Sequence, residues 1–125
     1  MSHLFQLGQF TLHSGKESSF KIECDALTFE DWKTIAHIIG STFSFKEVEG
    51  IPTGGLILEN LLKPYRRETG TYSLLIVDDV FTTGGSMEKH RNKRSDVHGV
   101  VLFSRVPEKM MPYWIDAIFS MNISA

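Results

Sequence analysis

The sequence predicts an α/β fold with a central, mainly parallel sheet, flanking helices and a small extended segment at the N-terminus. Strand-like and helix-like segments alternate through the middle of the chain, which favours an open parallel sheet. Residues 74–77 form a continuous apolar run, typical of a central parallel strand covered on both faces. The chain has 125 residues, of which 42% are hydrophobic and 22% charged, which suits one domain over residues 1–125.

The N-terminal segment predicts two extended pieces, residues 5–15 and 18–27, around a turn at Ser14-Gly15. Between Phe20 and Asp25, apolar and polar residues alternate with the period of a half-buried strand. Residues 28–40 predict an amphipathic helix with Thr28 as its N-cap and Gly40 as its stop. Its expected buried face follows the helical spacing of Trp32, Ile35, Ala36 and Ile39.

The core is expected to continue from this helix with alternating strands and helices. The expected elements are a strand over 43–50, a loop over 51–55, a helix over 56–63 that stops before Pro64, a polar loop over 65–72, a buried strand over 73–78, a short solvated helix over 86–96, a buried strand over 98–104, and a last strand or short helix over 113–121.

The composition limits the function. The net charge of −2 gives no general attraction to nucleic acid or anionic lipid, so neither is expected as a partner. A single cysteine, Cys24, suits a reducing compartment, and we expect a cytoplasmic protein. No apolar run reaches the roughly 18 residues of a membrane span, and the first residues do not resemble a signal peptide.

Two adjacent carboxylates, Asp78 and Asp79, end the apolar run, and a Thr/Gly-rich loop, Thr82–Ser86, follows them. Ligands of parallel α/β sheets bind at the carboxyl ends of strands. The amides and hydroxyls of such a loop suit a phosphate, whereas carboxylates accept hydrogen bonds from sugar hydroxyls. The combination predicts a site for a 5-phosphoribosyl group. The alternative is that acids and glycines only cap a strand end.

The string LLIVDDVFTTGGS resembles the phosphoribosyl-pyrophosphate signature of the type I phosphoribosyltransferases, with Phe81 as a variant. GIPTGG, Gly50–Gly55, resembles the pyrophosphate loop of that family, although by itself it also fits a plain turn. The resemblance implies a type I phosphoribosyltransferase-like fold. It also implies Mg²⁺ as cofactor, carried mainly by substrate oxygens and without protein ligands.

The segment FTLHSGKESSFKIECD is similar to the N-terminal hood of orotate phosphoribosyltransferases, which helps to cover the base. The resemblance therefore implies a hood-like segment over about 1–27 and a core over 28–125. Arg105 follows a predicted strand, where orotate enzymes carry an arginine that holds the carboxylate of the base. A solvated charge is the alternative for Arg105. His13 stands where several relatives have lysine, and Lys21 where many have an aromatic residue.

The chain is shorter than full-length orotate enzymes. Those enzymes have an N-terminal helix, and between the two motifs they carry an extra strand and a long mobile loop. The basic residues of that loop close over the pyrophosphate, often across a dimer interface. Here 22 residues separate Gly55 from Asp78. Lys63, Arg66 and Arg67 either replace that loop or decorate a solvated turn.

The resemblance implies transfer of 5-phosphoribosyl from phosphoribosyl pyrophosphate to a nucleobase, with orotate favoured, as in pyrimidine biosynthesis. The alternatives are a non-catalytic module that binds phosphoribosyl pyrophosphate, as sensor or partner subunit, and a transferase for a different base. A homodimer is possible by resemblance. The expected catalytic residues are Asp78 and Asp79. The expected substrate-binding residues are Val80, Thr82, Thr83, Gly84, Gly85, Ser86, Pro52, Thr53, Gly54, Gly55, His13, Lys21, Arg66 and Arg105.

Overall fold

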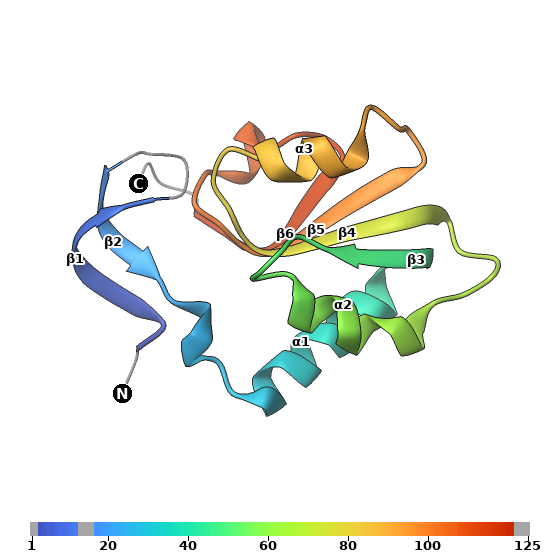
Figure 1. The fold of residues 1–125 in the computed structure, drawn as a ribbon, viewed down its shortest axis with the longest axis horizontal. Coiled ribbons are helices and arrows are strands. Elements are labelled where there is room, and N and C mark those ends of the chain that lie inside the picture. The colour runs from blue at the N-terminus through green and yellow to red at the C-terminus, as the bar shows by residue number, and fades with distance from the viewer. Residues whose placement is uncertain (1–2, 13–16, 122–125) are drawn as a thin grey trace.

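The computed structural model describes residues 3–12 and 17–121, which form two sheets. Strands β1 (Phe5–Thr11) and β2 (Glu17–Ile22) pair as an antiparallel hairpin. Four parallel strands form the main sheet in the order β3-β4-β5-β6, namely β3 (Phe45–Gly50), β4 (Tyr72–Phe81), β5 (Val97–Ser104) and β6 (Ile115–Ser120). The hairpin stands beyond the carboxyl ends of these strands (Figure 1). The predicted fold class is confirmed.

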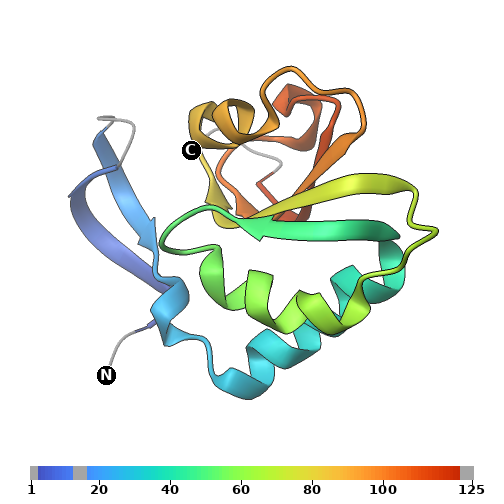
Figure 2. The ribbon, with the colours of Figure 1, turned by 45° about the vertical axis from the view of Figure 1, so that its right-hand side comes forward.

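Helices cover both faces of the main sheet (Figures 1 and 2). Helices α1 (Phe29–Thr42) and α2 (Leu56–Leu62) bury Ile39 and Leu58 against one face. Helix α3 (Gly85–Arg91) buries Met87 against the other face. The apolar residues of β4 alternate between the two cores, because successive strand side chains point to opposite faces. Short 3₁₀ turns lie at Cys24–Ala26, Lys63–Tyr65 and Glu108–Met110.

Helix α1 begins as predicted and ends later than predicted. The Thr28 hydroxyl accepts from the Asp31 amide at 3.1 Å, and the Asp31 carboxylate accepts from the Thr28 amide at 2.9 Å, so a complete capping box starts the helix. The prediction that Gly40 stops the helix is wrong, because the helix continues to Thr42. Gly40 instead faces the ring of Tyr65, where a Cβ atom would overlap the ring. Close packing explains the glycine.

The central strand is longer than the predicted apolar run. β4 pairs with β5 as far as Phe81 and Ser104, so Asp78 and Asp79 lie within the strand near its carboxyl end. The last element that the structure describes is the strand β6, which settles the choice left open for residues 113–121.

The connections of β4 differ in hand. Both β3–α2–β4 and β4–α3–β5 step in the same direction across the sheet, yet α2 and α3 lie on opposite faces. The two connections therefore have opposite hands, and Figure 1 shows that β3–α2–β4 is the left-handed one. About 98% of such parallel crossovers are right-handed. The short segment between the two sequence motifs thus produces an uncommon topology.

In the described part of the chain, no helix combines the length and the apolar character that crossing a membrane would require.

Candidate functional site

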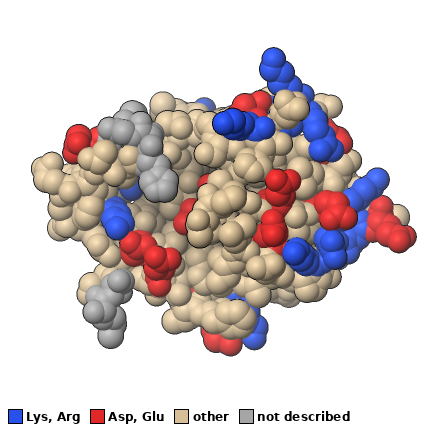
Figure 3. Space-filling view, in the orientation of Figure 1, with Lys and Arg blue, Asp and Glu red and all other residues tan. Residues whose placement is uncertain are grey.

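A cleft of about 990 Å³ lies between the hairpin and the carboxyl ends of the main sheet. In Figure 3 the molecule is hollowed between the hairpin and the core. Both sequence motifs contribute to the lining, as does the hairpin. The lining residues are Gln9, Phe10, Thr11, Leu12, Lys21, Ile22, Glu23, Ile51, Pro52, Thr53, Gly54, Asp78, Asp79, Val80, Phe81, Thr82, Thr83, Gly84, Gly85, Ser86, Met87, Lys89 and Arg105.

The two carboxylates at the end of β4 are held by backbone amides. The Asp79 amide donates to Asp78 Oδ1 at 2.8 Å, and the Val80 amide donates to Asp79 Oδ1 at 2.8 Å. Burial, and then the neighbouring Asp79 carboxylate, raise the pKa of Asp78 to about 8. Near neutral pH the pair therefore retains a proton. It can donate one hydrogen bond to a bound hydroxyl as well as accept others.

The loop that follows β4 presents unused backbone donors. Gly84 has a φ of 79°, in the left-handed region that favours glycine, and a Cβ atom there would also press on the Phe81 ring. Among the described residues, none accepts a hydrogen bond from the amides of Gly84, Gly85 or Ser86. Thr82, Thr83 and Ser86, each of which carries a hydroxyl, line the cleft with these amides. This set of neutral donors suits an anion such as a phosphate.

The loop between β3 and α2 lies directly beside the carboxylates. It is fixed to β4 by the Ile51 amide, which donates to the Val77 carbonyl at 2.9 Å. Gly54 faces the Asp79 carboxylate so closely that a Cβ atom on Gly54 would lie 2.6 Å from Asp79 Oδ1. The Pro52–Thr53 peptide within this loop is cis. The structure therefore brings the GIPTGG and DDVFTTGG motifs together.

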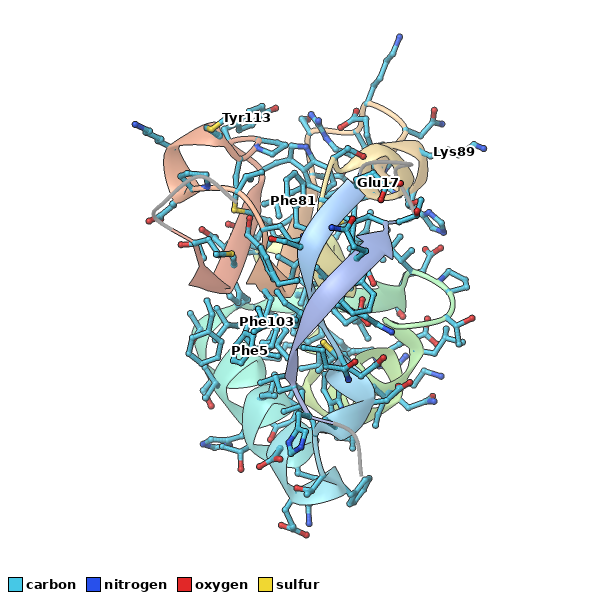
Figure 4. All side chains as sticks on the ribbon, turned by 90° about the vertical axis from the view of Figure 1, so that its left-hand side faces the viewer. Phe5, Glu17, Phe81, Lys89, Phe103 and Tyr113 are labelled. Carbon is cyan, nitrogen blue, oxygen red and sulfur yellow. The ribbon has the colours of Figure 1, made fainter. Side chains whose placement is uncertain are left out.

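The hairpin forms the opposite wall, which Figure 4 shows in front of the main sheet. Lys21 Nζ lies 2.9 Å from Glu23 Oε2, and both side chains line the cleft. Arg105 is buried, with 7% of its surface exposed, and its Nη2 donates to Ser18 Oγ and to the Phe20 carbonyl of β2. Burial lowers the pKa of Arg105 from its ordinary value. The wall is therefore charged and is joined to the core.

Two of the expected site residues that the structure describes, Arg66 and Gly55, do not line the cleft. Arg66 pairs with Glu47 at 3.2 Å, and the next amide, of Arg67, donates to Phe45 at the start of β3. Arg66 thus lies at the end of the sheet opposite the cleft. Gly55 is packed beneath the loop, where its amide donates to the Ile51 carbonyl at 2.8 Å. His13 lies outside the described residues.

The cleft also includes residues that the sequence motifs did not indicate. Gln9 and Glu23 come from the hairpin, and Lys89 comes from α3. The alternation between Phe20 and Asp25 predicts that Glu23 lies on the polar face of a strand, but it does not indicate that this face meets a cleft. Across residues 3–12 and 17–121, no three His, Cys, Asp or Glu side chains gather in a way that could hold a metal ion.

Comparisons with known proteins identify the fold. No protein-family model and no curated protein sequence matches the chain. Solved structures do match it. Orotate phosphoribosyltransferase from Aeropyrum pernix has a TM-score of 0.69 and 22% identity, over 94% of this chain and 88% of that chain. The chain has the type I phosphoribosyltransferase fold.

Other solved structures with this phosphoribosyltransferase fold agree. The enzyme from Francisella tularensis has a TM-score of 0.59 and 18% identity, over 94% of this chain and 80% of that chain. The enzyme from Mycobacterium tuberculosis, in complex with Fe(III) dicitrate, has a TM-score of 0.61 and 13% identity, over 94% of this chain and 89% of that chain. The fold that the sequence resemblance implied is confirmed.

Proposed function

We propose that this protein is a phosphoribosyltransferase. It binds phosphoribosyl pyrophosphate in the cleft and transfers the 5-phosphoribosyl group to a nucleobase with release of pyrophosphate. The observation that carries the proposal is the meeting of three groups at one sheet edge: the Asp78–Asp79 pair, the free amides of Gly84–Ser86 and the loop at Pro52–Gly54. Of the candidate bases, orotate is favoured by the sequence resemblance.

Each part of the cleft has a chemical role in this reaction. Val80 and the loop from Thr82 to Ser86 hold the 5′-phosphate through amides and hydroxyls. Asp78 and Asp79 bind the ribose hydroxyls, and their negative charge stabilises the positive charge that develops at C1 as pyrophosphate leaves. The loop at Pro52–Gly54 takes the pyrophosphate. Lys21 faces the base from the hairpin.

Mg²⁺ fits this site as a companion of the substrate. Phosphate oxygens are its preferred ligands, and few protein ligands are needed when they are present. The Asp79 carboxylate lies against Gly54 of the loop at Pro52–Gly54, and Asp78 lines the same cleft. Bound Mg²⁺ would neutralise charge on the leaving pyrophosphate.

The test is release of pyrophosphate by purified protein with phosphoribosyl pyrophosphate, Mg²⁺ and one of several bases: orotate, uracil or a purine. The proposal expects a steady rate with at least one base and none without Mg²⁺. Asp79→Asn serves as the matched inactive protein. Tight binding of phosphoribosyl pyrophosphate without turnover of any base would rule out the transferase.

A second candidate is a module that binds phosphoribosyl pyrophosphate without turnover. One observation favours it: none of the basic residues in the segment 56–77 lines the cleft. Arg66 pairs with Glu47, and Lys63 Nζ lies 4.0 Å from Glu59 Oε2. Nothing from this segment would then neutralise the leaving pyrophosphate. Calorimetry with phosphoribosyl pyrophosphate and Mg²⁺, next to the turnover assay, separates the two candidates.

A further inference from the structure

Arg105 joins the hairpin to the main sheet. Its Nη2 donates to Ser18 Oγ at 2.6 Å and to the Phe20 carbonyl at 3.0 Å, and its guanidinium lies over the Phe20 ring, 4.1 Å from the centroid. Within residues 3–12 and 17–121, no other side-chain hydrogen bond connects β1 or β2 to the sheet. One guanidinium therefore supplies the polar attachment of this wall.

The two acceptors are fixed relative to each other. The Ser18 hydroxyl donates to the Phe20 carbonyl at 2.8 Å and accepts from the Phe20 amide at 3.2 Å. Ser18 does not line the cleft. A buried charge is costly unless it is paired or hydrogen-bonded, so these contacts are part of what keeps Arg105 inside the protein.

The hairpin is also attached by apolar contacts, because Ile22 at the end of β2 packs against the main core. The Phe5 ring meets the Phe103 ring edge-on, with centroids 6.0 Å apart. Figure 4 shows Phe5 beside Phe103, at the end of the hairpin opposite Glu17. Arg105 thus holds the part of β2 that these contacts do not reach.

The chemistry of the guanidinium limits what else Arg105 can bind. Arginine holds a carboxylate best through two parallel N–H donors. The two forks that a guanidinium offers, Nε with Nη2 and Nη1 with Nη2, both include Nη2. In this protein Nη2 already donates to two oxygens of the hairpin. A carboxylate bound by either fork would have to share that nitrogen with β2.

We propose that Arg105 is a positioning residue, which holds the β1–β2 hairpin as the wall of the cleft and supports every base alike. It does not read a carboxylate on the base. This inference rests on the proposed function for its kinetic part, whereas its structural part concerns the hairpin alone.

The structural part is tested by hydrogen exchange of the amides of residues 17–22 in Arg105→Ala and Ser18→Ala. Both should exchange faster than wild type, with at least a tenfold effect for Arg105→Ala and a smaller one for Ser18→Ala. Arg94→Ala, which removes an exposed ion pair with Asp96, is the control and should leave these amides unchanged. Unchanged exchange in both test variants would overturn the anchor.

The kinetic part compares KM and kcat for orotate and uracil. Arg105→Ala should raise KM for both bases by similar factors and change kcat less. Arg105→Lys should regain part of the loss, because one ammonium can donate to both hairpin oxygens but cannot supply a fork. A loss of tenfold or more confined to orotate, with no rescue by lysine, would overturn the proposal. If no pyrophosphate is released with any base, the proposed function fails. Hydrogen exchange still tests whether Arg105 holds the hairpin.

Discussion

The carboxylate of Asp79 lies against the backbone of Gly54, with no room for a Cβ atom between them. This contact joins the two loops of the cleft, one from each sequence motif. Gly54 and Gly50 differ in what an added Cβ atom would meet. A Cβ on Gly54 would meet a side chain that can move, whereas a Cβ on Gly50 would lie 2.6 Å from the carbonyl carbon of Gly55, which cannot.

Gly54→Ala should therefore impair binding more than folding. Displacement of the Asp79 carboxylate is expected to weaken binding of phosphoribosyl pyrophosphate with Mg²⁺ at least tenfold, as measured by calorimetry. Gly50→Ala is the comparison, and overpacking against backbone should cost it about 1–3 kcal/mol in the free energy of unfolding. If Gly54→Ala bound normally, Asp79 would not need its present position.

Asp79→Asn should reduce activity at least a hundredfold and change the melting temperature by only a few degrees. The amide oxygen of asparagine can still accept from the Val80 amide, but the negative charge beside the ribose is lost. Pyrophosphate release and calorimetric melting measure the two effects. A variant that mainly unfolds would support the alternative in which the acids only cap the strand.

Asp78 should make the stability depend on pH in an unusual direction. Its pKa is raised to about 8, from about 3.9 in an unfolded chain, so the native state holds the extra proton between these values. The free energy of unfolding should therefore fall as pH rises from about 4 to 8. Asp78→Asn should remove this fall, because asparagine does not titrate. Urea denaturation across that range, with parallel curves for the two proteins, would contradict the raised pKa.

Thr28→Ala should affect stability alone. It removes the acceptor of the Asp31 amide in the capping box, which typically costs about 1 kcal/mol. Thr28 does not line the cleft, so kcat and KM of the folded protein should stay at wild-type values. Urea denaturation and the turnover assay measure the two properties. A change in KM would mean that α1 influences the cleft.

The sequence could predict the elements because their patterns are local. Residues 74–77 are apolar on both sides of the strand, and the capping residues of α1, Thr28 and Asp31, lie three positions apart. The stop at Gly40 could not be judged in this way, because a ring 25 residues later in the chain, that of Tyr65, packs against it. Local rules do not include such distant packing.

The residues of the candidate site also differ in how far local sequence patterns could predict them. The residues of the two motifs could be found because each motif combines a strand end with a loop, and parallel strand ends meet at one edge. The expectation that Arg66 binds substrate fails, because Arg66 pairs with Glu47 away from the cleft. Closeness to a motif in sequence does not indicate at which end of the sheet a residue lies. The fixed partners of Arg105 on β2 are more than 80 positions away in sequence, so they required the structure.

The left-handed connection through α2 also marks a place where the protein can be lengthened. Strand β3 is an edge strand of the main sheet, and β4 is its single neighbour. Residues 66–71 lead from the turn after α2 to the start of β4. A new strand inserted into this link would pair along the free edge of β3, and the connection from β3 through α2 to that strand would then be right-handed. Residues 66–71 are thus the natural insertion point for an engineer who wishes to graft a basic loop onto this small scaffold.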